Sequence, residues 1–232
     1  MSRIENVSLT PSEYRNAVFI DFEGRKSLNG EHYPLPYMAG VFRPRKKGKN
    51  GTYEAVFFKE SWKPAANGSS GRARIADIES FTEELLEEIS TEDKRVVHWT
   101  IHEKEILQRH LPASLFKQLE PFLYNVHPIA RRYANRFRKF GVQQSAKGKT
   151  LEEFFSVLYQ KRNPYPPLPL GPSIVCQRID RACERTQRWR KFTDKQQEYV
   201  RDLLAYNEGD CRATWLIARR IGNFYASELC DS

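Results

Sequence analysis

One short segment near the N-terminus constrains the fold more than any other. Residues 17–24 have the sequence AVFIDFEG, an apolar run rich in β-branched and aromatic side chains that ends in two acids and a glycine. A run of this kind is typical of a central strand that is buried on both faces. Because successive side chains of a strand point to opposite faces, we expect Asp21 and Glu23 to share one face of a sheet and Phe22 to enter the opposite layer.

The segments that follow predict a sheet with helices packed against it. Two more strand-like runs are joined by a basic turn that ends in Asn50-Gly51, a dipeptide typical of hairpins, so three consecutive antiparallel strands are expected. After residue 75 the apolar side chains recur at helical spacing, and strands then alternate with helices. The expected further strands lie at 37–42, 52–58, 95–99 and 122–126, and the expected helices at about 78–89, 103–111, 151–159, 178–190 and 193–221. This order predicts an α/β fold with a mixed sheet of about five strands flanked by helices.

The composition is that of a folded protein. Hydrophobic residues make up 40% of the chain and aromatic residues 12%, which is enough to bury a core and too much for a disordered basic tail. We expect one domain over residues 1–232, with mobile loops near 44–51, 63–72 and 163–173, where glycine, serine, proline and basic residues gather. No apolar run approaches the roughly 20 residues that span a bilayer, no signal peptide opens the chain, and the four cysteines lack zinc or disulfide spacing. A cytoplasmic protein that does not enter a membrane is therefore expected.

The acid pair at the end of the first strand predicts a metal site. Two carboxylates on one face repel each other unless a cation lies between them, and their hard oxygen atoms suit Mg²⁺ or Mn²⁺. The D-x-E pattern alone is weak, because Asp77-Ile78-Glu79 repeats it at the start of an amphipathic helix. The alternative for Asp21 and Glu23 is a strand that ends in solvated acids before a glycine turn.

Two further segments carry acids toward the same place. A strand that ends near Trp99, followed by a helix from about residue 102, would bring Glu103 to the C-terminal edge of the strand, where ligands gather in α/β sheets. Glu105 competes with Glu103 for this role, and Glu103 could equally be a first-turn acid that stabilises the helix dipole. Farther along, Tyr206 and Asp210 are four residues apart and lie on one face of a predicted helix. The alternative there is an exposed Asp and a half-buried Tyr.

Taken together, these three segments resemble the DnaQ-like DEDD exonuclease superfamily of the ribonuclease H-like fold, in its tyrosine variant. Within it the chain looks most like the YprB-type branch, in which a strand, a small turn and a Glu that opens a helix form the second motif, as in VHWTIHE at 97–103. The resemblance covers about residues 17–221 and implies a ribonuclease H-like mixed sheet and a metal-dependent 3′ to 5′ exonuclease. It implies that two Mg²⁺ or Mn²⁺ ions are held by Asp21, Glu23, Glu103 and Asp210. Tyr206 would orient the attacking water, since its ordinary pKa near 10 makes it a poor base.

The chain departs from the family pattern at two positions. Glu103 stands where proofreading exonucleases commonly have Asp, and Asn125 stands where related chains often have an acid. A catalytically inactive nucleic-acid-binding module of the same fold is therefore the alternative. A metal-dependent transferase or phosphatase on a similar sheet is a third interpretation, because fold analogy alone does not settle the chemistry.

The charge of the chain favours a polyanionic partner. There are 38 Lys and Arg against 29 Asp and Glu, a formal charge of +9, so nucleic acid or an acidic membrane surface would be attracted. Two groups of arginines are candidate contacts. One is interleaved with aromatic residues and comprises Arg131, Arg132 and Arg136. The other recurs at steps of three, four and three, as on one helix face, and comprises Arg178, Arg181, Arg185 and Arg188.

Arginines that bind phosphates, beside aromatic rings that stack on bases, are typical of a single-strand binding groove. The alternative is that these are solvated helix faces whose aromatic residues turn into the core. The family resemblance makes a single-stranded 3′ end the expected substrate. Because YprB-like modules also occur beside helicase and RecB-like nuclease domains, it further allows for a larger nuclease or helicase complex.

Overall fold

The computed structural model of the chain describes residues 9–24, 34–45, 51–138, 150–159 and 168–230. Within these residues, six strands form one sheet in the order β4-β3-β2-β1-β5-β6. They are β1 (Val18–Glu23), β2 (Met38–Pro44), β3 (Gly51–Phe57), β4 (Ala73–Ile75), β5 (Val96–His98) and β6 (Leu123–Asn125). The pairs β1–β2 and β2–β3 are antiparallel, whereas β1–β5, β5–β6 and β3–β4 are parallel. The predicted α/β class with a mixed sheet is confirmed, and the order is compatible with a ribonuclease H-like sheet.

The sheet has one strand more than predicted, the edge strand β4. It follows residues 63–72, for which the prediction of a loop is wrong at residues 63–67. Residues 63–72 have the composition of a mobile loop, but they begin with the helix α2 (Lys63–Asn67), which leads by a turn into the edge strand β4. Pro64, Ala65 and Ala66 are buried, and α2 contacts α8 (Pro172–Arg185). A proline in the first turn and two alanines favour a helix, and burial of these side chains outweighs the linker-like sequence around them.

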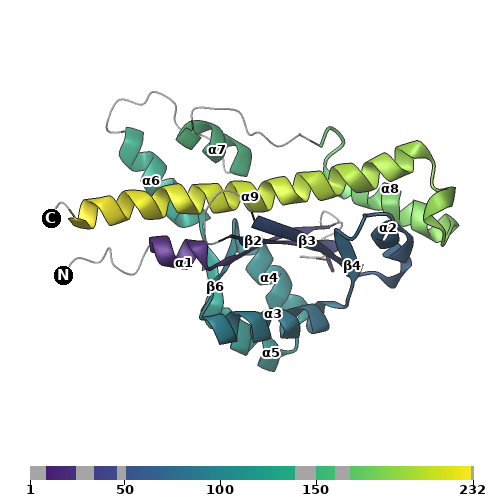
Figure 1. Ribbon diagram of the computed structural model, residues 1–232, viewed down its shortest axis with the longest axis horizontal. Coiled ribbons are helices and arrows are strands. Elements are labelled where there is room, and N and C mark those ends of the chain that lie inside the picture. The colour runs from purple at the N-terminus through teal and green to yellow at the C-terminus, as the bar shows by residue number, and fades with distance from the viewer. Residues whose placement is uncertain (1–8, 25–33, 46–50, 139–149, 160–167, 231–232) are drawn as a thin grey trace.

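Helices cover both faces of the sheet (Figure 1). The long helix α9 (Asp194–Cys230) crosses one face together with α8, and α1 (Pro11–Arg15), α6 (His127–Arg138) and α7 (Leu151–Tyr159) pack against α9. The other face is covered by α3 (Ile78–Glu92), α4 (Ile101–His110) and α5 (Ala113–Leu119). Short 3₁₀ turns lie at Glu60–Trp62, Glu120–Phe122 and Trp189–Lys191. The five predicted helices are present, although α8 begins earlier than predicted, at a proline that suits the first turn.

The side chains of β1 alternate between the two layers, as the sequence predicts. Phe19 packs in the core beneath α9, whereas Val18 and Ile20 pack in the core beneath α3. Phe22 joins the α3 side, where its ring lies 6.1 Å from that of Phe58. The alternation therefore carries the next two odd-numbered side chains of β1, both acids, to the face that α9 covers.

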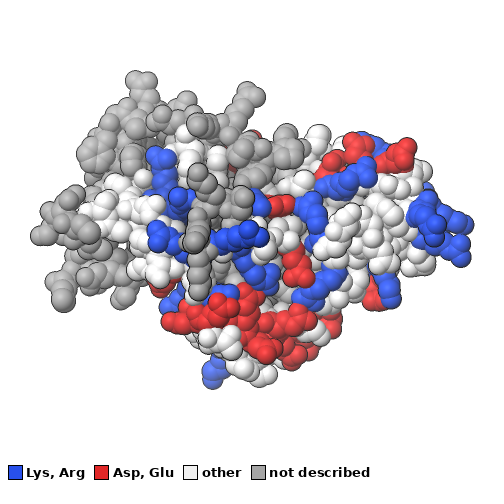
Figure 2. All heavy atoms as spheres, in the orientation of Figure 1, with Lys and Arg blue, Asp and Glu red and all other residues white. Residues whose placement is uncertain are grey.

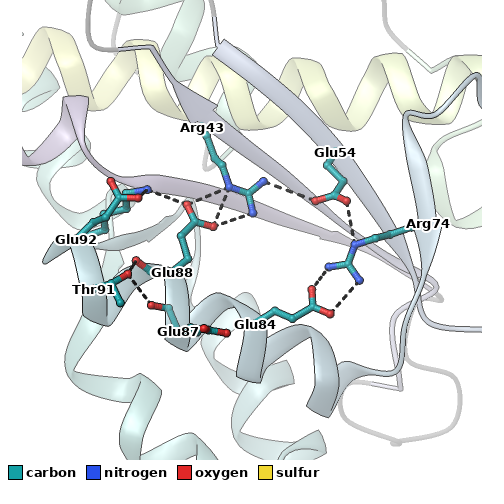
Figure 3. Close-up of polar contacts among 9 residues, drawn as sticks. Arg43, Glu54, Arg74, Glu84, Glu87, Glu88, Thr91 and Glu92 are labelled. Atoms are coloured by element: carbon teal, nitrogen blue, oxygen red, sulfur yellow. Dashed lines mark hydrogen bonds and ion pairs between the residues drawn. The ribbon is translucent and has the colours of Figure 1, made fainter.

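A network of ion pairs joins β2, β3 and β4 to α3 (Figure 3). Arg43 of β2 donates to both carboxylate oxygens of Glu88, at 2.8 and 3.0 Å, and lies 3.7 Å from Glu54. Arg74 of β4 donates to Glu54 at 2.9 Å and also pairs with Glu84 of α3. These two arginines are thus neutralised by neighbouring glutamates, and they fasten the acidic helix to the sheet on the face opposite α9.

Two of the predicted loops lie largely outside the described residues. The loops predicted near 44–51 and 163–173 fall largely on residues 46–50 and 163–167, which lie outside the described part of the chain. Residues 172 and 173 already belong to α8. Among the described helices, none combines the length and the apolar character needed to cross a membrane, and this includes the 37-residue α9.

Candidate metal centre

Three carboxylates converge where the end of β1 meets the middle of α9. Asp21 and Glu23 come from β1 and Asp210 from α9, and one carboxylate oxygen from each lies within 4.8 Å of the other two. Glu23 is only 6% exposed. The structure therefore brings together the predicted D-x-E pair and the predicted helix acid, and the three residues could hold a metal ion.

Among the described residues, negative charges dominate the electrostatics of this cluster. Burial raises the pKa of Asp21 and of Glu23 well above the usual range, and neighbouring carboxylates raise it further. Burial, with the carboxylates of Glu152 and Glu103, raises the pKa of Asp210 to about 7. The charged groups with the largest influence on these three acids are all carboxylates. A divalent cation bound by these hard oxygen atoms would offset the repulsion, so the donor set fits a metal ion.

Tyr206 lies one helical turn before Asp210 and donates a hydrogen bond to its carboxylate. Burial and the negative charges of Asp210, Glu23 and Asp21 hold the pKa of the Tyr206 hydroxyl above its usual range. The hydroxyl therefore stays protonated at any physiological pH. It can donate a hydrogen bond and orient a neighbouring group, but it cannot act as a base.

Glu103 lies beside the cluster but is not one of its three members. It is 7% exposed, and its Oε2 accepts hydrogen bonds from the backbone nitrogen of Thr100 at 3.1 Å and from the Thr100 hydroxyl at 2.8 Å. Its carboxylate thus closes the capping box at the start of α4, which is the helix-terminus role weighed for it from the sequence. Its negative charge nevertheless raises the pKa of Asp21, Glu23 and Asp210, so it lies near the cluster.

Glu105, the competing residue, is placed differently. It is half-buried, and its Oε2 lies 3.5 Å from Nδ1 of His102, on its own helix. It is not among the groups that perturb the three acids. Of the two glutamates in the second segment, Glu103 is therefore the one whose charge influences the site.

The sequence analysis did not identify one further side chain of the site, Asn207. This residue is fully buried, and its Nδ2 donates to Oδ2 of Asp21 at 2.7 Å and to the Asp21 backbone oxygen at 3.3 Å. The signal was present in the helix sequence YNEGD at 206–210, where Asn207 precedes Asp210 by three residues and so shares its side of the helix. A fully buried amide is expected to have a specific partner, and here the partner is an acid of the cluster.

The two predicted arginine groups are carried by α8 and α6 and by the residues just after α8. Arg181 and Arg185 are exposed on α8, and Arg178 is exposed with its guanidinium 5.1 Å from the centre of the Tyr199 ring and a hydrogen bond to the Tyr199 hydroxyl. Arg188 does not belong to that helix face, which is a correction. Thr186 has an extended backbone (φ −153°, ψ 135°) and ends α8 before Arg188 is reached. Figure 2 shows basic side chains gathered at the end of the molecule where α8 leads into α9.

The aromatic residues near these arginines are turned inward. Trp189 packs on Gly68 of the turn after α2, so closely that a Cβ on this glycine would lie 2.0 Å from the indole ring, and Phe192 is 4% exposed. In the other group, Arg131 and Arg132 are exposed on α6 and Tyr133 is buried. The side chain of Arg136 lies outside the described residues. The arginines are thus available to phosphates, but the aromatic side chains described beside them belong to the core.

Comparisons of the chain with models of protein families, with curated proteins and with solved structures found no match.

Proposed function

We propose that this protein is a metal-dependent nuclease that hydrolyses the phosphodiester bonds of nucleic acid, working 3′ to 5′ on a single strand with two Mg²⁺ or Mn²⁺ ions. The observation that carries the proposal is the convergence of Asp21, Glu23 and Asp210 beneath α9, with Tyr206 hydrogen-bonded to Asp210. Three carboxylates so close together, one buried and two half-buried, are costly without a cation, so a fold that keeps them together indicates a use for them. The residues and their order along the chain are those that the DnaQ-like resemblance implies.

In this proposal each residue of the site has a separate task. Asp21, Glu23 and Asp210 would hold the metal, with Glu103 near them at the start of α4. The bound metal would supply the activation of water and the stabilisation of charge on the leaving 3′ oxygen. Tyr206, which stays protonated, would position the attacking water by hydrogen bonding. Its hydrogen bond to Asp210 supports a positioning role.

The exposed arginines would supply the attraction for the substrate. Arg181 and Arg185 on α8 and Arg131 and Arg132 on α6 carry no ion pair to an acid among the described contacts, in contrast to Arg43 and Arg74 of the network in Figure 3. Unpaired guanidinium groups bind phosphate oxygens well.

The proposal further includes a cytoplasmic location, which the free buried thiols of three cysteines support. It also includes a place in a larger nuclease or helicase complex.

A catalytically inactive binding module of the same fold is the second candidate. Two observations favour it. Glu103 is engaged in the capping box of α4, and Asn125, at the end of β6, uses its Oδ1 to accept a hydrogen bond from the backbone nitrogen of His127 at 3.0 Å. In this case the fold and the basic surface would serve binding alone.

The test is the degradation of single-stranded DNA and RNA labelled at the 5′ end. We expect a ladder of shortened products with Mg²⁺ or Mn²⁺, no products in chelator, and no products from Asp21→Asn or Asp210→Asn. The matched control is Asp77→Asn, which alters the other D-x-E of the chain, at the start of α3, where Asn is an equally good helix cap. Strands that are retarded but never shortened would refute the nuclease and favour the binding module. Strands neither bound nor cut at low salt would favour a transferase or phosphatase instead.

A further inference from the structure

We propose that Asn207 and Tyr53 form a positioning pair that holds the Asp21 carboxylate in the orientation needed to bind metal. The inference rests on the proposed metal centre and deepens it, because it assigns a role to two residues that do not themselves bind the metal. It does not depend on which reaction the centre performs.

The side-chain amide of Asn207 points its nitrogen toward Asp21. A carboxylate offers only acceptors, so the nitrogen of the amide must face Asp21, and it does so at 2.7 Å from Oδ2. The same nitrogen reaches the Asp21 backbone oxygen at 3.3 Å, so the amide spans the side chain and the main chain of one residue. This double contact restricts the rotation of the carboxylate and engages one of its oxygens.

Tyr53 fixes this orientation of the Asn207 amide from the other end of the amide group. Its hydroxyl donates to Oδ1 of Asn207 at 2.9 Å. A flipped amide would lose both of its hydrogen bonds to Asp21 and turn its oxygen toward the acceptor oxygens of that carboxylate. Burial raises the pKa of Tyr53 well above its usual range, so the hydroxyl remains a donor at all working pH values. The ring of Tyr53 lies under the guanidinium of Arg72 at 5.4 Å, and Arg72 also pairs with Glu208 of α9. The tyrosine is therefore held in place on its other side.

The backbone of β2 provides an independent observation, a glycine at position 40. Gly40 of β2 is the direct partner of Asp21 in the β1–β2 ladder. A Cβ on Gly40 would lie 1.6 Å from Oδ1 of Asn207 and 3.1 Å from the ring of Tyr53. Only glycine leaves room for the amide between the strand and the helix, so the sheet is built to admit Asn207 at this point.

Outer partners that orient a metal ligand commonly affect metal affinity strongly. A buried Asn and Tyr that merely completed the core would affect stability but not metal affinity. A second Tyr–Asn pair in the chain serves as a control that distinguishes an effect on stability from an effect on metal affinity. Tyr14 of α1 donates to Oδ1 of Asn223 of α9 at 2.5 Å, which is the same kind of bond to the same helix, far from the three acids.

The experiment is a titration of the full chain with Mn²⁺, in which free Mn²⁺ is measured by electron paramagnetic resonance, together with thermal unfolding in chelator. We expect Asn207→Ser to weaken Mn²⁺ binding roughly 10- to 100-fold. Tyr53→Phe, which leaves the amide in place and should fold if Asn207→Ser does not, is expected to weaken it about two- to tenfold. Tyr14→Phe is expected to lower the unfolding temperature about as much as Tyr53→Phe while leaving Mn²⁺ affinity unchanged.

Equal Mn²⁺ affinity in Tyr53→Phe and the parent protein would overturn the positioning role while leaving the metal centre intact. Equal loss of affinity in Tyr53→Phe and Tyr14→Phe would also overturn it, since the effect would then follow stability. A parent protein that binds no Mn²⁺ would remove the metal centre and the proposed function, and the positioning role with them.

Discussion

Replacing Asp210 by Asn should make the metal-free protein more stable, although it removes a residue of the proposed site. The substitution keeps the shape of the side chain and an oxygen that can accept the hydrogen bond of Tyr206. It removes one negative charge from a buried cluster of like charges. In the unfolded chain Asp210 ionises at its ordinary pKa of 3.8, whereas burial and nearby carboxylates raise its pKa in the folded protein to about 7.

The size of the effect follows from these two values. At about 1.4 kcal/mol for each tenfold change in the equilibrium, the gap between 3.8 and about 7 corresponds to about 4 kcal/mol when Asp210 is fully ionised. The neighbouring acids titrate together with Asp210, so part of this free energy is shared among them. We therefore expect a gain on the order of 2–4 kcal/mol at pH 8, equivalent to a rise of roughly 5–15 °C in the unfolding temperature.

The sign of the pH dependence is fixed by the direction of the shift. Because the folded state holds the proton of Asp210 more tightly, the folded parent protein is protonated between about pH 4 and 7 where the unfolded chain is not. The stability of the parent should therefore fall as the pH rises through this window. The stability of Asp210→Asn should fall less, so the gap between the two opens across the window and persists above it.

The assay is thermal unfolding followed by circular dichroism in chelator, at a series of pH values from 4 to 8. Asp77→Asn serves as the control, since Asp77 is exposed at the start of α3 and its pKa is lowered by hydrogen bonds from Ser80. It should give no gain at pH 8. If Asp210→Asn proved no more stable than the parent at pH 8, the buried carboxylates would not repel one another as inferred here, and the case for a required cation would fail.

Three further predictions follow from the same contacts. At pH 8, Mg²⁺ or Mn²⁺ at 100 times its Kd should raise the stability of the parent by about 2.7 kcal/mol. The same metal concentration at pH 5.5 should raise it less, because protons compete for the acids and so increase the Kd, and the rise should vanish in Asp210→Asn; thermal unfolding measures both effects. Gly40→Ala should cost roughly 1–3 kcal/mol in urea unfolding, because its Cβ would lie 1.6 Å from Asn207, and an unchanged midpoint would contradict the tight approach. Arg181→Gln with Arg185→Gln should weaken binding of single-stranded DNA and reduce the slope of log K against log salt by about 1, whereas Arg74→Gln, whose arginine pairs with Glu54 and Glu84, should leave the slope unchanged.

The sequence was sufficient to predict the structure wherever the regular spacing of side chains along one strand or one helix determines their placement. The alternation of β1 places Asp21 and Glu23 on one face, and the spacing of four places Tyr206 and Asp210 on one side of α9; the structure confirms both arrangements. These predictions succeed because a strand and a helix have fixed periods that the tertiary fold does not change.

Features that depend on contacts between distant segments were not predictable in this way. The sequence around α2 predicts a loop because it is rich in glycine and serine, and it does not reveal that three residues of α2 are buried and that the helix contacts α8. The spacing of the arginines predicts Arg188 on α8 because it continues past Thr186, where the helix ends. The role of Asn207 depends on the absence of a side chain at Gly40, on a strand far away along the chain. Tertiary packing decides each of these cases.

The central claim is that the acids beneath α9 exist to bind metal. It is tested most directly by a crystal structure of the protein soaked with Mn²⁺, with the ions located by their anomalous scattering. We predict two peaks bounded by Asp21, Glu23 and Asp210, with Glu103 at the edge of the site. Fully occupied Mn²⁺ sites elsewhere on the protein, with none among these carboxylates, would contradict the account.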